Sequence, residues 1–202
     1  MRGVPLAAKR LIDMVLSLVV LVFGWPLLVV IALLVKRSSP GPALFVQERV
    51  GKGQKPFSLY KFRTMTVAPR GYDPIHWDSA EEARVTRVGQ FLRDYGLDEL
   101  PQAINILKGD MSIVGPRPRR PVHVRDYDER QRKVFAMRPG VVCLASFPGR
   151  RSIPVEQRVE LHVQYVENWS LRLDFEILLR AIPVVLGRRD AREVVMPEGE
   201  GS

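Results

Sequence analysis

Two adjacent carboxylates, Asp98 and Glu99, are the residues whose type and position best suit chemistry. A helix is expected to begin at Asp98, because apolar residues follow it at helical spacing. Asp98 would then be the N-cap, and Pro101 is tolerated there because the first turn needs no internal N–H bond. Free N–H groups at a helix start attract a phosphate. Any stable helix start also uses such acids, so these residues alone leave capping and catalysis both open.

Cationic side chains at two other places could bind a phosphate. Arg117 lies between Pro116 and Pro118, which favour an extended backbone and a rigidly presented guanidinium. Lys61 and Arg63 are two residues apart on an expected strand, so they share a face. Each place also has a plainer interpretation. Arg117 could be an ordinary arginine in a proline-rich loop, and Lys61 and Arg63 could lie on a solvated strand face.

Asp126-Tyr127-Asp128 has the Asp-x-Asp form of the metal-binding triplet in many nucleotide-sugar glycosyltransferases. Basic residues follow the local acids at i,i+4 spacing, which is typical of a solvated helix face with salt bridges. The pairs are Asp126/Arg130, Asp128/Arg132 and Glu129/Lys133. A charged helix over residues 122–135 therefore explains the triplet better than a metal site.

The charge balance indicates an anionic partner. The chain has 31 Lys+Arg against 22 Asp+Glu, a net charge of +9, which suits a nucleic acid, an anionic lipid surface or a phosphorylated substrate. No nucleic-acid recognition motif is present, so nucleic acid is the least favoured of the three. Cys143 is the only cysteine, which excludes an internal disulfide and favours a reducing environment. The three histidines have no cysteine partners, which argues against structural zinc.

Residues 11–35 predict a membrane anchor. The run is almost wholly apolar, Asp13 is its only charge, and at ~1.5 Å per residue a helix of this length could cross a bilayer. It is too long for the core of a signal peptide, so we expect it to be retained. Pro26 lies inside the run and is expected to bend the helix.

Basic residues flank both ends of this anchor. They are Arg2, Lys9 and Arg10 before it, and Lys36 and Arg37 after it. The positive-inside tendency would hold both ends in the cytoplasm, as a re-entrant hairpin turning near Pro26 does. A kinked spanning helix is the alternative, and the residues alone leave both open.

The remaining segments predict one mainly helical α+β domain without internal repeats. A cluster of helix-breaking residues at 38–42 separates the anchor (1–37) from a single folded domain (38–190). A polar tail (191–202) follows the domain. A mixture of aromatic residues and arginines near the C-terminus suits either an interfacial helix or an ordinary amphipathic one. The expected elements are a hairpin (43–49, 57–64), a loop (66–79), helices (81–95, from 98, 122–135), an apolar stretch (141–147) and a helical segment (155–189) broken at Pro183.

Taken together, these segments resemble the bacterial sugar transferase family, specifically its small monotopic polyprenyl-phosphate phosphoglycosyl transferases. The likeness covers nearly the whole chain, and many short motifs occur in the family's order. They are Lys9-Arg10-x-x-Asp13, Pro26, Pro40-Gly41-Pro42, Phe45-x-Gln47-x-Arg49-x-Gly51, Lys61-Phe62-Arg63-Thr64-Met65, Leu97-Asp98-Glu99-Leu100-Pro101-Gln102, Asn105-x-Leu107-Lys108-Gly109-Asp110-Met111-Ser112, Val114-Gly115-Pro116-Arg117-Pro118, Arg138-Pro139-Gly140 and Asp174.

The resemblance implies transfer of a sugar-1-phosphate from a UDP-sugar to a polyprenyl (undecaprenyl) phosphate, with release of UMP. Asp98 would attack the β-phosphate to form a phosphosugar-enzyme intermediate, Glu99 would assist, and Mg²⁺ would bind with Asp98 as its ligand. The residues that would contact phosphates or substrate are Lys61, Arg63, Arg93, Arg117, Arg150 and the supporting carboxylate Asp174. The family also implies a re-entrant anchor in the bacterial inner membrane, with the catalytic domain on the cytosolic face and interfacial helices around it.

The sequence departs from the family over residues 141–148. Family members often continue Ile-Thr-Gly-Trp-Ala-Gln-Val-Asn after the Arg-Pro-Gly motif, where this chain is apolar or small, while Gly149-Arg150 remains. If that loop touches the sugar or the nucleotide, donor preference would be unusual. Two other functions compete: a glycosyltransferase that moves the sugar alone and releases UDP, and a membrane adaptor without enzymatic activity. The sugar, the prenyl chain length, the glycan pathway and the oligomeric state are not specified by these residues.

Overall fold

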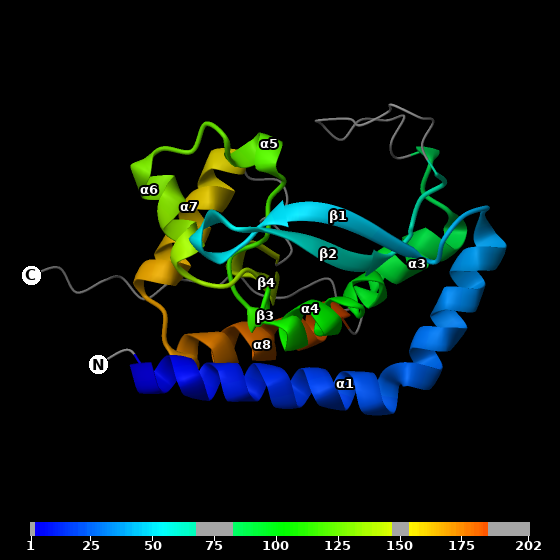
Figure 1. The fold of residues 1–202 in the computed structure, drawn as a ribbon, viewed down its shortest axis with the longest axis horizontal. Coiled ribbons are helices and arrows are strands. Elements are labelled where there is room, and N and C mark those ends of the chain that lie inside the picture. Colours follow the sequence, from blue (N-terminus) through cyan, green and yellow to red (C-terminus); the bar gives the residue numbers. More distant parts are fainter. Residues whose placement is uncertain (1–2, 68–82, 147–153, 186–202) are drawn as a thin grey trace, which may run out of the picture.

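The computed structural model describes residues 3–67, 83–146 and 154–185 of the chain. The longest element is α1 (Gly3–Ser38), one continuous helix with Pro26 inside it. Figure 1 shows a sharp bend in α1, which divides it into a first arm beneath the domain and a second arm along its side. Proline removes one backbone hydrogen bond and bends a helix, as expected from the sequence. Most of the expected 66–79 loop and the 191–202 tail lie outside the described residues.

The first arm of α1 is apolar on the outside and polar where it touches the domain, whereas the second arm packs on the domain with apolar residues. Lys9, Asp13 and Ser17, one per turn, are buried. Most outward positions are large apolar residues, such as Phe23 and Trp25, which are 78% and 61% exposed. This is the reverse of a helix that packs on a soluble core. By length and composition, Pro5–Ser38 could cross a membrane, since it contains an 18-residue window with a mean hydropathy of 3.0.

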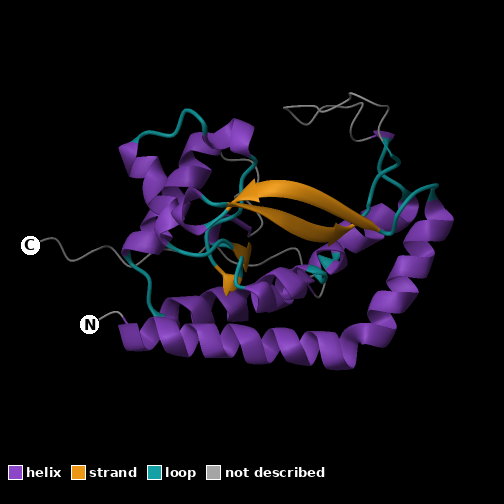
Figure 2. Ribbon diagram, viewed as in Figure 1, coloured by secondary structure: helices purple, strands orange, loops and turns teal. Residues whose placement is uncertain are grey.

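An antiparallel hairpin crosses the domain, as Figure 2 shows. Strand β1 (Leu44–Val50) pairs with β2 (Pro56–Phe62), within two residues of the expected strands. Helix α4 (Gln102–Lys108) is attached to β2 by Asn105, which is fully buried. The Asn105 side chain donates to the Ser58 carbonyl at 2.7 Å and accepts from the Tyr60 N–H at 3.0 Å. The hairpin and α4 therefore form one unit.

Helix α3 (Arg87–Asp94) begins later than the sequence pattern predicted. The expected helix over 81–95 is wrong as one element, because Val85 pairs with Met65 in an isolated β-bridge and Thr86 is the N-cap of α3. Ala83 is helical, and residues 81 and 82 lie outside the described residues. The helix packs closely on the end of the hairpin at Gly89, where a Cβ would lie 1.9 Å from the Thr64 carbonyl oxygen. Only glycine fits there, and this contact fixes where α3 presents Arg93.

The expected charged helix over residues 122–135 is also wrong as one element. It consists of α5 (Pro121–Val124), α6 (Glu129–Arg132) and a 3-10 turn, η3 (Lys133–Ala136). Asp128 interrupts the helix because it caps α6, its side chain accepting from the Gln131 N–H at 2.7 Å. The expected i,i+4 ion pairs are replaced by pairs to α7 (Val155–Glu167), namely Arg130–Glu160 at 2.6 Å and Lys133–Glu167 at 2.7 Å.

The C-terminal segment forms two helices rather than one broken at Pro183. Helix α7 (Val155–Glu167) ends at Asn168, and α8 (Leu171–Val185) runs through Pro183. A core cluster that includes Val114, Tyr165 and Ile177 packs both helices against a two-stranded parallel sheet. This sheet pairs β3 (Ser112–Val114) with β4 (Gly140–Val142), and the 3-10 turn η4 (Leu144–Ser146) follows it.

Candidate active site

Asp98 lies in the tight turn between α3 and α4. The turn is a short 3-10 helix, η2 (Leu97–Glu99), and Gly96 before it has a left-handed backbone with φ 67°. The expectation that Asp98 is a helix N-cap is therefore wrong, since the residue before α4 is Pro101. The left-handed glycine ends α3 and turns the chain so that Asp98 points inward, where it is only 8% exposed. A carboxylate is thus buried without a capping role.

Cations from three different elements act on this carboxylate. They are Lys61 of β2, Arg93 of α3 and Arg117 of the loop after β3. Burial, followed by the neighbouring Glu99, raises the pKa of Asp98 to about 6, and the three cations oppose this shift. Burial also lowers the pKa of Lys61, with Asp98 opposing. The structure therefore brings together Asp98, Glu99, Lys61, Arg93 and Arg117, all of which the sequence predicted as site residues.

Contacts to neighbouring elements orient two of these cations. The guanidinium of Arg117 donates to Glu99 Oε1 at 2.8 Å, and this carboxylate raises the pKa of Arg117. Arg93 Nε donates to Thr64 Oγ1 at 2.9 Å. Half of the Arg117 side chain remains exposed. The arginines are thus positioned beside Asp98, and Arg117 also reaches the surface.

Two of the predicted substrate-binding residues are used to attach α1. Arg63 is buried and donates to the carbonyls of Val35 and Ser39, at 3.2 and 2.7 Å. Asp174 accepts from Lys9 Nζ at 2.6 Å. These contacts place Arg63 and Asp174 at opposite arms of the helix instead of among the charges that act on Asp98. The sequence motifs contain both residues, but they do not show which partners the fold supplies.

Asp174 makes two further hydrogen bonds inside the domain. Tyr165 Oη donates to Oδ1 at 2.6 Å, and Trp169 Nε1 donates to Oδ2 at 3.1 Å. Its carboxylate is therefore occupied by three donors. Arg150, the remaining predicted substrate contact, lies outside the described residues.

Arg49 lies near Arg117 and Glu99, although it was not predicted as a site residue from the sequence. Burial lowers its pKa to about 10, with contributions from Arg117, Arg120 and Arg119, while Glu99 opposes the shift. Its guanidinium donates to the Pro118 carbonyl at 3.3 Å. The spacing Phe45-x-Gln47-x-Arg49 was the available signal, because it places Arg49 at the end of β1 next to the arginine-bearing loop.

Asp98 and Glu99 do not form a complete metal site by themselves. They suit a magnesium ion that is also coordinated by phosphate groups of a substrate. Within the described ranges there is no group of three or more His, Cys, Asp or Glu side chains that could hold a metal. Mg²⁺ is commonly bound by one or two carboxylates together with substrate phosphates. Glu99 is paired with Arg117, so Asp98 is the carboxylate that fits this role. A buried carboxylate with surrounding cations is suited to phosphoryl transfer, which depends on positioning and charge neutralisation.

Known proteins with similar sequences match nearly the whole chain. It is 41% identical over 186 residues to a UDP-glucose:undecaprenyl-phosphate glucose-1-phosphate transferase of Caulobacter vibrioides, covering 88% of this chain and 69% of that protein. It is 38% identical over 178 residues to a sugar transferase of Bacillus subtilis, covering 88% and 87%. The identity is 37% over 196 residues to an undecaprenyl-phosphate galactose phosphotransferase of Salmonella typhimurium, of which the chain spans 41%. Residues 4–188 match the sequence profile of one family, and the chain belongs to it: the bacterial sugar transferases.

Proposed function

We propose that this protein is a phosphoglycosyl transferase that moves a sugar-1-phosphate from a UDP-sugar to undecaprenyl phosphate and releases UMP. The observation that carries the proposal is Asp98, a buried carboxylate with a raised pKa on which Lys61, Arg93 and Arg117 all act. The relatives support the reaction class, since two of them are named as undecaprenyl-phosphate sugar-phosphate transferases. The product would enter a bacterial glycan pathway as its first membrane-bound intermediate.

In the first step, a carboxylate oxygen of Asp98 attacks the β-phosphorus of the donor. The bond from that phosphorus to the bridging oxygen breaks, UMP leaves with the electron pair, and an aspartyl-phosphosugar remains. In the second step, an oxygen of the lipid phosphate attacks the same phosphorus and displaces Asp98. Asp98 would hold a magnesium ion, which would supply charge neutralisation when bound. Lys61, Arg93 and Arg117 bind the phosphoryl oxygens, and Glu99 holds Arg117 in place.

We further propose that α1 is re-entrant, entering and leaving the bilayer on the cytosolic side of the inner membrane. Both arms are bound to one domain: Lys9 in the first arm bonds Asp174 and the Val114 carbonyl, and Arg63 bonds the end of the second arm. A spanning helix would separate its ends by roughly 30 Å of hydrocarbon. Helix α8 adds an exposed apolar stripe of Phe175, Leu179 and Ile182 at helical spacing, which suits an interfacial helix.

Cysteine labelling tests this topology. In a Cys143→Ser background, Arg2→Cys and Arg37→Cys are each expected to react with a membrane-impermeant maleimide only after the cytosolic face is opened. Inverted vesicles should therefore label both variants, and intact spheroplasts neither. Labelling of the two positions from opposite sides would show a spanning helix and contradict the proposal.

The released nucleotide tests the reaction. With undecaprenyl phosphate in nanodiscs and a panel of UDP-sugars, we expect UMP release and a lipid diphosphate product for at least one donor. Release of UDP would indicate a glycosyltransferase that moves the sugar alone. If no donor is turned over while the protein still binds membranes, the adaptor function would replace the enzymatic one.

A further inference from the structure

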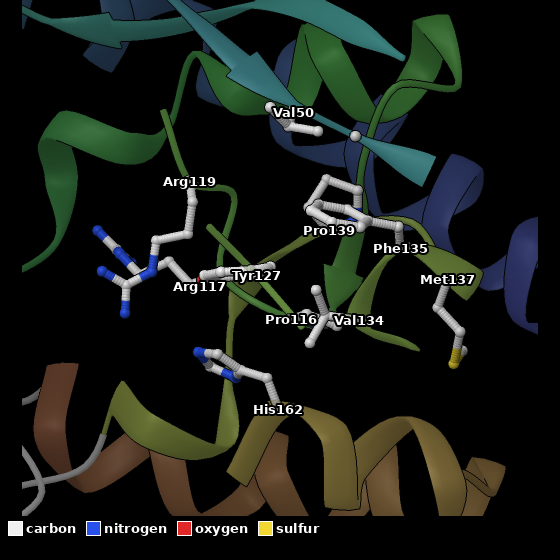
Figure 3. Close-up of a pocket in the computed structure, with 11 residues that line it drawn as sticks. Val50, Pro116, Arg117, Arg119, Tyr127, Val134, Phe135, Met137, Pro139 and His162 are labelled. Atoms are coloured by element: carbon white, nitrogen blue, oxygen red, sulfur yellow. The ribbon is translucent and has the colours of Figure 1, made fainter. Parts of the chain in front are cut away.

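A pocket lies beside Arg117 under the loop that follows β3. It is open to solvent, and the empty space of about 330 Å³ around its lining includes solvent outside the protein. Apolar side chains such as Val50 and Phe135 form part of its wall, and the polar lining consists of Arg117, Arg119, Tyr127 and His162. Figure 3 shows the side chains of Arg117 and Arg119 extending toward the same side of the pocket, with the His162 ring projecting toward them from α7.

His162 is a buried imidazole with an unused hydrogen-bonding atom. It is 3% exposed, and its Nδ1 has no hydrogen-bond partner among the residues that the structure describes. Burial, followed by the positive charges of Arg119, Arg117 and Arg158, lowers the pKa of His162 to about 3, so the ring is neutral. A buried polar atom without a partner is costly, and a ligand with a hydrogen-bonding group would remove that cost.

Two arginines near His162 also have a buried nitrogen without a hydrogen-bond partner in the described residue ranges. The Nε atoms of Arg119 and Arg158 are buried and have no hydrogen-bond partner within the described part of the chain. Arg158 lies one helical turn before His162, so both side chains share a face of α7. Burial lowers the pKa of Arg119, and the nearby Arg158 and Arg117 lower it further. No ion pair found in the described residues neutralises Arg119 or Arg158, so an anion is the ligand that this cluster fits.

The pocket adjoins the surroundings of Asp98 through Arg117. In an in-line displacement the attacking and leaving oxygens lie on opposite sides of the phosphorus. Arg117 joins the two regions, because it pairs with Glu99 beside Asp98 and its charge also acts on Arg119 and His162. The charges that act on Asp98 are those of Glu99, Lys61, Arg93 and Arg117. A diphosphate that reaches Asp98 with its β-phosphate can therefore extend past Arg117 into the pocket.

We propose that Arg119, Arg158 and His162 form the subsite for the nucleoside monophosphate end of the donor, which is the UMP leaving group. This inference rests on the proposed function. The phosphate of the nucleotide would lie between the two guanidinium groups and receive a hydrogen bond from His162 Nδ1–H, in the tautomer that carries its proton there. The neutral imidazole adds a donor without adding another charge to an already cationic pocket.

Equilibrium binding of UMP tests the subsite without requiring turnover. Calorimetric titration of the full chain in nanodiscs is expected to give a Kd for UMP that rises about 10-fold or more in Arg119→Gln and in Arg158→Gln, as loss of a charge-assisted hydrogen bond predicts. The matched control Arg125→Gln, an exposed arginine on the surface beyond α5, removes the same charge and should leave the Kd within about 2-fold. In turnover, the KM for the UDP-sugar should rise with the Kd, and the KM for the lipid phosphate should not.

His162 provides a second pair of variants that separates binding from packing. His162→Asn places an amide N–H near the position of Nδ1 and is expected to retain UMP binding within about 3-fold, whereas His162→Val should weaken it about 10-fold. Unchanged UMP affinity in both arginine variants would overturn the subsite, as would an equal loss in Arg125→Gln or a rise only in the KM for the lipid phosphate. UMP binding that depends on Arg119 in a protein that turns over no UDP-sugar would uphold the subsite and refute the proposed reaction.

Discussion

Asp98→Asn is expected to abolish sugar-phosphate transfer and, in the same protein, to stabilise the fold at neutral pH. An amide of nearly the same shape cannot form the proposed aspartyl-phosphosugar, so UMP release should fall by at least about 10³-fold. Membrane association should not change, because the substitution leaves the apolar surface of α1 unaltered. Normal turnover in this variant would refute the assignment of Asp98 as the nucleophile.

The stability effect follows from the raised pKa of Asp98, which is about 6 in the folded protein against an ordinary 3.8. Folding favours the protonated form, so the stability that this group contributes is fully present below pH 3.8 and is lost as the pH rises through about 6. At pH 7.5 the ionised carboxylate costs up to about 3 kcal/mol, which the amide removes. Urea unfolding at pH 7.5 and at pH 4 should therefore show a gain in the first condition only.

A surface aspartate and the pH profile of activity provide the controls. Asp126→Asn, at an exposed position, should change the free energy of unfolding by less than about 0.5 kcal/mol at either pH. Because attack needs the ionised carboxylate, kcat/KM of the wild-type protein should fall as the pH drops below about 6. Equal or lower stability of Asp98→Asn at pH 7.5 would mean that Lys61, Arg93 and Arg117 compensate the buried charge fully.

Local sequence patterns predicted the parts of the site that depend on neighbours along the chain. The alternation around the hairpin placed Lys61 on β2, and Pro116 and Pro118 identified an extended loop that presents Arg117. The prediction that Asp98 caps a helix was wrong. A 3-10 turn follows the left-handed Gly96, and Asp98 lies within that turn. Only the tertiary contact with β2 and α3 shows that this carboxylate is buried among cations.

Residues whose roles depend on distant partners could not be assigned in this way. Arg63 was expected to contact phosphate, but its donors reach carbonyls 24 and 28 residues away in sequence. His162 was only one of three scattered histidines until α7 placed it against the loop of Arg117 and Arg119. Periodicity identifies the face of a helix that is buried, but it does not identify the groups that meet that face.

Asp174→Ala is expected to have the largest effect on stability, because it leaves the ammonium of Lys9 buried without a counter-charge. The two side chains pair at 2.6 Å, and each is only 9% exposed. Removing one partner of a buried pair typically costs about 3–5 kcal/mol. The loss should be measured by chemical unfolding in detergent, with release of the first arm of α1 from the domain reported by proteolysis. A cost below about 1 kcal/mol would show that Lys9 finds another partner.

Replacing the pair without leaving a charge separates an attachment role of Asp174 from a role in substrate binding. Lys9→Met with Asp174→Asn removes both charges and keeps an acceptor oxygen for Tyr165 Oη, although the amide NH2 replaces the oxygen that accepts from Trp169 Nε1. The double variant should therefore regain a large part of the lost stability. If Asp174 only attaches α8 to α1, UMP release by this variant should stay within about 3-fold of wild type, since the charges that act on Asp98 are unaltered. A stable double variant that has lost turnover would instead show that the Asp174 carboxylate takes part in binding the substrate, and that attachment of the anchor and catalysis share one residue.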